Sequence, residues 1–207
     1  WPPQNGIDNE DRLQVPADSV RAITVGAIAC KESPDSLVKL NQPTSYSCKG
    51  PGPTYIPKPE LVHYSGNLAI NNGKLTCFNQ GILSFDAEGN ITEDVGTSFS
   101  CPLVARTLSI IQHKLTDSTT NDMIKALTIH DSHIPDGLGP SDEVFQYVGF
   151  GKPDKVENVL KCSESEITLM FEQEIFQGHN LIYPLTWPQS LKDDDEKHRG
   201  KVKMTLV

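Results

Sequence analysis

The sequence of 207 residues contains no long hydrophobic run, and its uncharged apolar stretches are short, such as Ala22–Ala29. A helix that spans a membrane needs about 20 consecutive apolar residues. We therefore expect no segment to cross a membrane. The first residues also lack the cationic stretch followed by an apolar one that is typical of a secretion signal.

Basic residues are scarce relative to acidic ones. There are 18 Lys and Arg residues against 27 Asp and Glu residues, which gives a formal net charge of −9 at pH 7. A chain of this charge repels a phosphate backbone, so we expect no binding to nucleic acid. The hydrophobic fraction of 37% is still sufficient for a folded core.

The sequence has five cysteines but no Cys-x-x-Cys pair: Cys30, Cys48, Cys77, Cys101 and Cys162. Without such pairs, a zinc ribbon and a thioredoxin-like site are excluded. An odd number cannot all pair within one chain, so we predict mostly buried free thiols, which favour a cytoplasmic location.

His130 and His133 lack a third ligand at metal spacing, so we predict that they lie at a helix end and that the chain binds no metal and no cofactor.

Apolar patterning predicts strands in the first part of the chain. Ala22–Ala29 is a β-branched run typical of a buried strand in a parallel sheet. Six prolines between residues 33 and 67 predict a long loop that contains one strand, at Glu60–His63. A hairpin is predicted over Leu75–Ile91, with its turn at Glu88-Gly89-Asn90.

From Thr97 onward the apolar residues recur at helical spacing. A long helix is predicted to start there, with Pro102 in its first turn, where a missing N–H group costs nothing. A second helix is predicted after Thr119-Thr120, which are N-cap candidates, and it ends before Pro135. Further on, Gly149-Phe150-Gly151-Lys152 is predicted to form a tight turn.

The last part of the chain has a different pattern. Three further strands are predicted, at Glu166–Phe171, Asn180–Leu185 and Lys201–Leu206. The last alternates apolar and polar residues, which is typical of an antiparallel strand with one face exposed to solvent. We therefore predict an α/β domain over residues 1–160 and the start of a β domain over residues 161–207. Both ends, Trp1 and Val207, are expected to be cut points in a longer protein.

One stretch, Gly96-Thr97-Ser98-Phe99-Ser100-Cys101-Pro102, leads directly into the long predicted helix. A serine at a helix N-terminus lies in the positive field of unpaired backbone N–H groups, which stabilises an alkoxide or a nearby oxyanion. Gly96 leaves room for a substrate backbone. The alternative interpretation is that Ser98 or Thr97 is only an N-cap for this helix.

The stretch GTSFSCPLVA resembles the GTSxxxPxVA nucleophile motif of the subtilases, the subtilisin-like serine peptidases. Three further stretches resemble subtilase segments in the order that the family requires. Val15–Ser19 with the strand after it is similar to the proline-containing turn and "VGA" strand, Ser45–Gly52 to the "FSSRGP" loop, and Lys58–Val62 to the "KPDVVAPG" segment. The resemblance implies an α/β fold: the C-terminal part of a subtilisin-like parallel-sheet domain, followed by a partial antiparallel β-sandwich-like region.

The resemblance also implies site residues. It makes Ser98 the nucleophile, whose own backbone N–H group helps to bind the oxyanion, with Thr97 beside it. Asn5 supplies a side-chain amide to the same oxyanion hole, with Gln4 and Asn9 as alternatives. The family's Asp and His precede the serine in DTG or DSG and HGT motifs, and neither motif occurs here. We expect both residues in an N-terminal part of the same protein.

The resulting hypothesis is a serine endopeptidase that cleaves protein or peptide substrates, of which this chain alone is inactive because it lacks a base. His63 is the only histidine before Ser98, and it stands in the stretch similar to the "KPDVVAPG" segment rather than before Gly-Thr. Two other classes stay open. One is a pseudopeptidase that binds peptides or proteins without cutting them, and the other is a fold in which the GTS segment only caps a helix.

Overall fold

The structure is a computed structural model and describes residues 11–115, 119–159, 168–184, 192, 195, 197 and 201–207. In chain order its elements are β1 (Val25–Ile28), the 3-10 helix η2 (Pro53–Tyr55), β2 (Leu61–Tyr64), β3 (Ala69–Asn71), β4 (Lys74–Thr76), β5 (Ile82–Phe85), β6 (Ile91–Asp94), α1 (Thr97–Lys114), α2 (Asn121–His130), α3 (Asp142–Val148) and α4 (Val156–Val159).

Two parallel strands, β1 and β2, form the centre of the fold. They pair from Val25 opposite Leu61 to Ile28 opposite Tyr64. β1 lies within the strand predicted at Ala22–Ala29, and β2 begins one residue later than predicted. Parallel strands need a long connection between them, and the proline-rich segment supplies it. The strand predictions that define the sheet are therefore confirmed.

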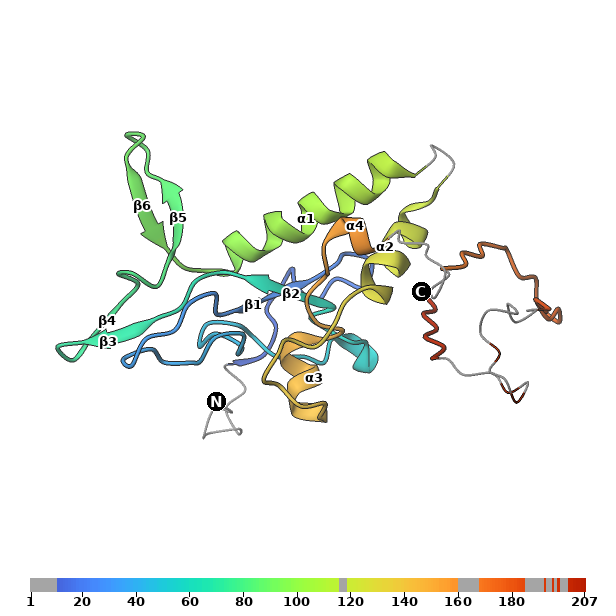
Figure 1. Cartoon of the computed structure of the whole chain (residues 1–207), viewed down its shortest axis with the longest axis horizontal. Helices are drawn as coiled ribbons and strands as arrows, with labels where there is room; N and C mark the ends of the chain where they lie inside the picture. Colours follow the sequence, from blue (N-terminus) through green and yellow to red (C-terminus); the bar gives the residue numbers. More distant parts are fainter. Residues whose placement is uncertain are drawn as a thin grey trace.

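Helices cover the two faces of this strand pair, α1 on one face and α3 on the other (Figure 1). On the α1 face, Leu61 packs in one cluster with Val104 and Ile129. On the α3 face, Val62 packs in another cluster with Val144. Successive side chains of a strand point to opposite faces, which is why these neighbouring residues belong to different clusters. This layering confirms the predicted α/β class.

The two predicted helices are present as α1 and α2. Thr120 caps α2 as predicted, because its side chain accepts a hydrogen bond from the Met123 N–H group. α1 begins at Thr97, but Pro102 is its sixth residue and lies beyond the first turn, so that part of the prediction is wrong. Proline has no N–H group to pair with the carbonyl four residues earlier, which here belongs to Ser98. The first turn of α1 is therefore joined to the rest of the helix by one hydrogen bond fewer.

A short helix that the sequence did not indicate, α3, is followed by the tight turn predicted at Gly149-Phe150-Gly151-Lys152. Gly149 has a φ of +55°, a conformation that L side chains rarely adopt. The turn brings the chain along the edge of β2, where the Phe150 N–H group donates to Glu60 O at 2.8 Å. The glycine thus allows α3 to pack directly beneath the strand pair.

The single predicted hairpin is in fact two, and both project from the body of the molecule (Figure 1). β3 pairs with β4, and β5 pairs with β6, each antiparallel. The prediction missed the first turn, where Asn72 and Gly73 have φ values of 49° and 74°. The predicted Glu88-Gly89-Asn90 turn joins β5 to β6, and there the Asp86 carboxylate accepts a hydrogen bond from Asn90 N–H at 2.8 Å.

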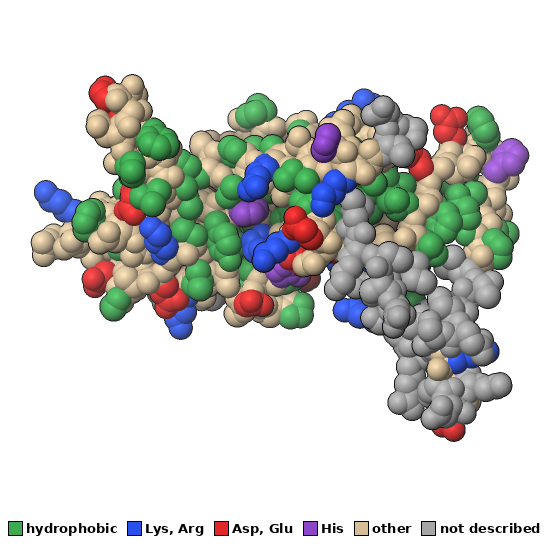
Figure 2. Space-filling model, turned by 45° about the horizontal axis from the view of Figure 1, so that its top comes forward, with side chains coloured by type: hydrophobic (Ala, Val, Ile, Leu, Met, Phe, Trp, Pro, Cys, Tyr) green, Lys and Arg blue, Asp and Glu red, His purple; other side chains and the backbone are tan. Residues whose placement is uncertain are grey.

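The β5–β6 hairpin runs straight into the GTS segment, because only Val95 separates Asp94 from Gly96. Figure 2 shows hydrophobic side chains at the surface of the projecting hairpins. The large exposed ones on β5 and β6 are Leu83, Phe85 and Ile91.

The four cysteines within the described ranges are free thiols, as predicted: Cys30, Cys48, Cys77 and Cys101. None of these four is fully buried, and Cys101 is exposed, so the expectation of burial is wrong for them. Partial burial, followed by the nearby Asp11 charge, raises the pKa of the Cys48 thiol. Cys162 lies outside the described residues.

The strands predicted after residue 160 do not appear in the residues that the structure describes. Residues 168–184 and 201–207 contain no strand, and the rest of those predicted strands lies outside the description. A strand needs backbone partners, and alternation of apolar side chains alone does not provide them. Instead, Lys203 Nζ donates to the carbonyls of His130 and Ser132 at the end of α2. The division at residue 160 and the β-sandwich-like region stay predictions.

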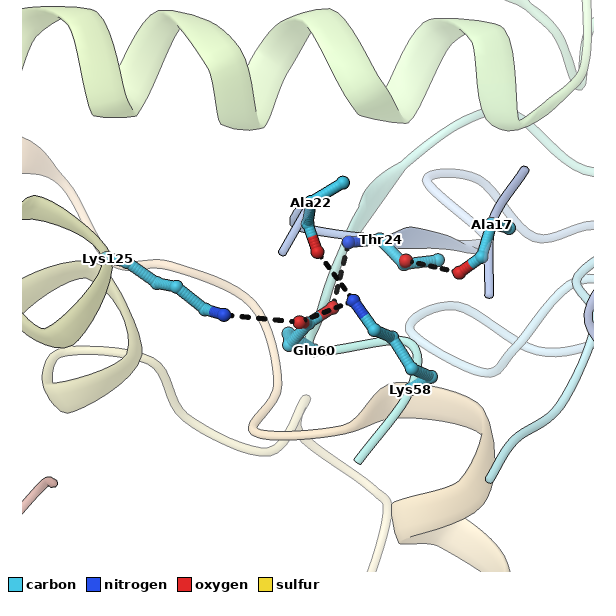
Figure 3. Close-up of polar contacts among 6 residues, drawn as sticks. All are labelled: Ala17, Ala22, Thr24, Lys58, Glu60 and Lys125. Carbon is cyan, nitrogen blue, oxygen red and sulfur yellow. Dashed lines mark hydrogen bonds and ion pairs between the residues drawn. The ribbon is translucent and has the colours of Figure 1, made fainter. Parts of the chain in front are cut away.

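A buried ion pair lies at the start of β2. Lys58 Nζ is 2.6 Å from Glu60 Oε1, and the two side chains are only 0% and 4% exposed. Lys58 Nζ also donates to Ala22 O at 2.5 Å (Figure 3). Buried charges are stable only when they are paired and hydrogen-bonded, so this cluster fixes the geometry of the residues that form it.

The Glu60 carboxylate joins three separate segments. Its Oε2 atom accepts a hydrogen bond from Thr24 N–H at 2.8 Å, and Thr24 Oγ1 in turn donates to Ala17 O at 2.6 Å. Lys125 of α2 lies 3.4 Å from Glu60 Oε1 (Figure 3). The lead into β1, the start of β2 and the helix α2 therefore share one charged centre.

We expect Gly149→Ala to lower the free energy of unfolding by about 4 kcal/mol, because it combines a strained positive φ with a clash against backbone. The added Cβ atom would lie 2.0 Å from Pro59 O and 2.5 Å from Glu60 O. Gly137→Ala is the matched control, since Gly137 has a φ of +85° but nothing within 4 Å of its Cβ position. Its loss should be about 1 kcal/mol. Urea unfolding measures both, and equal losses would contradict the close approach.

We expect Glu60→Gln to destabilise the fold by about 3–5 kcal/mol, because it leaves the Lys58 ammonium buried without a counter-charge. Lys125→Met is the control: its side chain is 19% exposed, and its loss should be below about 1 kcal/mol. Urea unfolding of both variants at pH 7 gives the comparison. A larger effect at Lys125 than at Glu60 is incompatible with the proposed role of the buried pair.

Candidate active site

Ser98 is the second residue of α1, and its side chain is exposed. The N-cap residue, Gly96, has φ +148° and ψ +156°, a backbone conformation that L side chains rarely adopt. Glycine at this position therefore allows the chain to turn from the β5–β6 hairpin into the helix. Ser98 therefore lies in the first turn of the helix, at its N-terminal end.

The N-terminus of α1 carries no side-chain cap and no acidic residue in its first turn. The first N–H groups of a helix have no partner within the helix. In the described part of the chain, the N–H groups of Thr97 and Ser98 meet no acceptor, and neither side-chain hydroxyl caps the helix. The interpretation of this segment as a simple helix cap is therefore wrong. Two unpaired donors in the positive field of the helix form a site suited to an oxyanion.

Bonds within the first turn hold this arrangement. The Phe99 N–H group donates to Gly96 O at 3.0 Å. Ser100, which is 0% exposed, donates from Oγ to Thr97 O at 2.9 Å. The two serines of the motif thus differ: Ser100 is buried and bonded to backbone, whereas the Ser98 hydroxyl makes no hydrogen bond to a described residue.

No histidine within the described ranges is hydrogen-bonded to Ser98. His63 lies on β2, and its Nδ1 atom accepts a hydrogen bond from the Tyr64 N–H group at 2.9 Å. Burial, and then the charge of Lys152, lowers the pKa of His63 to about 4. His113 lies in the last turn of α1, at the opposite end from Ser98. The expectation that the catalytic base lies elsewhere in the protein stays a prediction.

The two histidines near residue 130 are separated by the end of α2. His130 is the last residue of α2, and its Nδ1 atom lies 3.0 Å from Thr205 Oγ1. His133 follows the helix and pairs through its backbone with Lys152. Across the described residues, no group of three or more His, Cys, Asp or Glu side chains could hold a metal ion. The same residues include no helix that is long and apolar enough to cross a membrane.

The amide candidates for the oxyanion hole, Asn5 with Gln4 and Asn9 as alternatives, lie outside the described residues. Their roles stay predictions. Thr97 is the first residue of α1, and its role in the oxyanion hole also stays a prediction.

One group of residues at this site was missed by sequence reasoning. Ser65, just after β2, accepts two hydrogen bonds at its carbonyl oxygen, from Tyr46 OH at 2.9 Å and from Gly96 N–H at 3.3 Å. The only signal in the sequence is a tyrosine where the similar "FSSRGP" loop has phenylalanine. Nothing in that signal pointed to a contact with the residue before α1.

The stretches that carry the resemblance lie close together in space. Ser47, in the stretch similar to "FSSRGP", accepts a hydrogen bond at Oγ from Ala27 N–H of β1 at 2.9 Å. Thr24 of the lead into β1 contacts both Ala17 and Glu60, which belong to the other two stretches. These short motifs, far apart in the sequence, thus surround the strand pair that precedes Ser98.

Comparison with known proteins agrees with this arrangement. The chain is 24% identical over 221 residues to "Uncharacterized protein y4bN" of Sinorhizobium fredii (strain NBRC 101917 / NGR234), and the match covers 95% of the chain and 51% of that protein. The chain thus spans about half the length of the curated relative. The profile of the Peptidase S8 group, described as the subtilase family, matches residues 4–156. That match includes the strand pair, α1 and Ser98, so the chain belongs to the subtilase family.

Proposed function

We propose that the whole protein is a serine endopeptidase and that Ser98 is its nucleophile. One observation carries the proposal. Ser98 is exposed at the uncapped N-terminus of an 18-residue helix, where its own N–H group and that of Thr97 have no acceptor among the described residues. Membership of a serine peptidase family supports the same assignment.

In the proposed reaction, Ser98 Oγ attacks the carbonyl carbon of a peptide bond while its proton passes to a base. The carbonyl oxygen becomes an oxyanion, which accepts a hydrogen bond from the Ser98 N–H group and lies in the field that Thr97 shares. A side-chain amide, assigned to Asn5, donates the second bond. The intermediate then releases the amine, which takes the proton from the base, and water hydrolyses the remaining acyl-enzyme.

We assign the base, a histidine, and the aspartate that orients it to a part of the protein outside these 207 residues. Two observations support this assignment. No described histidine is hydrogen-bonded to Ser98, and the curated relative is about twice as long as the match. A serine hydroxyl is a weak nucleophile without a base, so this chain alone should hydrolyse no peptide.

The competing function is a pseudopeptidase that binds peptides or proteins at the same surface. The observation that favours it is the lack of any hydrogen bond between Ser98 and the described residues. It differs from the first proposal in one respect: the whole protein would then bind peptide without turnover.

We expect Ser98→Ala to reduce peptide hydrolysis by the whole protein about 10⁴-fold or more, because the acyl-enzyme can no longer form. Ser109→Ala is the matched control, since Ser109 is an exposed serine on the same helix, and its activity should stay within about twofold of the parent. Turnover of a quenched fluorescent peptide measures both variants. A fully active Ser98→Ala protein rules out the proposed nucleophile.

The isolated chain provides the second part of this test. A fluorophosphonate probe should label Ser98 rapidly in the whole protein and only slowly in these 207 residues. Rapid labelling of the isolated chain would mean that the base lies within it. A whole protein that neither hydrolyses peptide nor reacts with the probe favours the pseudopeptidase.

His63 generates a separate prediction on pH. Its folded pKa of about 4 lies below the ordinary 6.5, so between these values the unfolded chain binds a proton that the folded chain does not. His63 therefore does not lower the free energy of unfolding above pH 6.5, and it lowers this free energy progressively as the pH falls toward 4. The free energy of unfolding falls between pH 7 and pH 4. Allowing for the partial exposure of His63, this fall should be about 2 kcal/mol smaller in His63→Gln than in the parent chain.

Urea unfolding at the two pH values, for the parent chain and for His63→Gln, measures this difference. His63→Gln in the whole protein should also leave the acid limb of the activity profile in place, because a group with this pKa does not titrate near neutrality. Loss of that limb would identify His63 as the base and overturn the assignment above.

A further inference from the structure

Three groups from distant parts of the chain meet just ahead of α1. The Tyr46 hydroxyl donates to Ser65 O at 2.9 Å and lies 2.8 Å from Ser65 Oγ. The Gly96 N–H group donates to the same Ser65 carbonyl at 3.3 Å. A hydroxyl has one proton, so a consistent pattern has Tyr46 donating to the carbonyl and Ser65 Oγ donating back to the Tyr46 oxygen.

The cluster is shielded from water. Ser65 is 0% exposed and Tyr46 is half-buried. Burial raises the pKa of Tyr46 above its ordinary value, while hydrogen bonds from Ser65 and Thr44 and one with the Gly96 backbone act in the opposite direction. The phenol is thus protonated at neutral pH and available as a donor, and its contacts reach both Ser65 and Gly96.

Few backbone hydrogen bonds support the lead into α1, although the Val95 side chain packs against Gly66. Gly96 has no side chain to cap the helix, and it follows a hairpin that projects from the body (Figure 1). Before it, Val95 N–H is bonded only locally, to Asp94 Oδ1 at 2.8 Å. The bond from Gly96 to Ser65 is therefore the described backbone hydrogen bond that joins this turn to the end of β2.

We propose that Tyr46 is a positioning residue for Ser98, whose hydroxyl holds the Ser65 carbonyl against Gly96 and so sets the direction of the first turn of α1. The two unpaired N–H groups and the Ser98 hydroxyl follow Gly96 directly, so a shift of this residue moves all three. The catalytic consequence rests on the function proposed above.

The test compares two tyrosines. Tyr46→Phe removes the hydroxyl and keeps the ring. Tyr64→Phe is the matched control, because Tyr64 precedes Ser65 but its hydroxyl donates elsewhere, to Asn41 Oδ1 at 3.0 Å. Hydrogen exchange followed by mass spectrometry, on overlapping peptides that begin several residues before Gly96 and include residues 95–99, reports the protection of the Gly96 amide in these 207 residues.

One hydrogen bond of ordinary strength corresponds to about a fivefold change in exchange rate. We expect about fivefold faster exchange over residues 95–99 in Tyr46→Phe, with no change there in Tyr64→Phe and none in α2 for either variant. Ser65→Ala keeps the carbonyl but removes its hydroxyl, and it should give a smaller increase at the same residues. Equal exchange in the parent chain and Tyr46→Phe overturns the proposal. Ser65→Ala decides the matter in the same way if Tyr46→Phe does not fold.

The whole protein provides the catalytic readout. Tyr46→Phe should lower kcat about fivefold while KM stays within about twofold, because positioning affects the reacting atoms more than ground-state binding. Tyr64→Phe should change neither. Faster exchange with an unchanged kcat overturns the positioning role. An inactive parent protein with faster exchange in Tyr46→Phe would instead refute the proposed function and leave the structural role of Tyr46 in place.

Discussion

The buried ion pair of Lys58 with Glu60 joins the lead into β1, the start of β2 and the helix α2. The two side chains have almost no contact with water, and their remaining polar atoms bond to Ala22 O and Thr24 N–H. Charges that are buried away from water are stable only when partners of opposite charge and hydrogen-bonding groups lie in fixed positions around them. The lead into β1 and the start of β2 therefore adopt one relative position, and the parallel pairing of the two strands follows from it.

Ser98 lies near the opposite end of the strand pair. β2 ends at Tyr64, and the next residue, Ser65, contacts both Tyr46 and Gly96. In open parallel sheets, functional groups gather beyond the carboxyl ends of the strands. β2 is thus fixed at its start by an ion pair and at its end by a hydrogen-bonded cluster, and the second of these lies directly before the helix of Ser98.

The sequence predicted the elements whose signals are local. β1, β2 and α1 have clear apolar patterns, and Thr120 is a regular N-cap. α3 was missed because it has only 7 residues, too few for a helical period to emerge. The predicted C-terminal strands rested on the apolar patterns of single segments. Such a pattern does not show whether a second strand is present to pair with the segment.

The same distinction between local signals and tertiary contacts applies to the candidate site. Ser98 and Thr97 could be predicted, because a short contiguous motif contains them. The burial of Lys58 has no signal in the sequence, since lysine is rarely buried, and only the fold supplies its partner. The contact of Tyr46 with Ser65 spans 19 residues, and that of Ser65 with Gly96 spans a pair of hairpins. Such contacts arise from tertiary structure and leave no local trace.

The helices of this chain also differ at their N-termini in a way that bears on function. α2 and α3 are capped by the side chains of Thr120 and Ser141, and both have acidic residues in the first turn. α1 is the longest of the three and has neither feature. A cap is worth about 1 kcal/mol and a negative charge there adds several tenths more, so α1 lacks stabilisation that its neighbours have. Either device would occupy or neutralise the N–H groups next to Ser98, and α1, unlike α2 and α3, leaves those donors open for a developing negative charge.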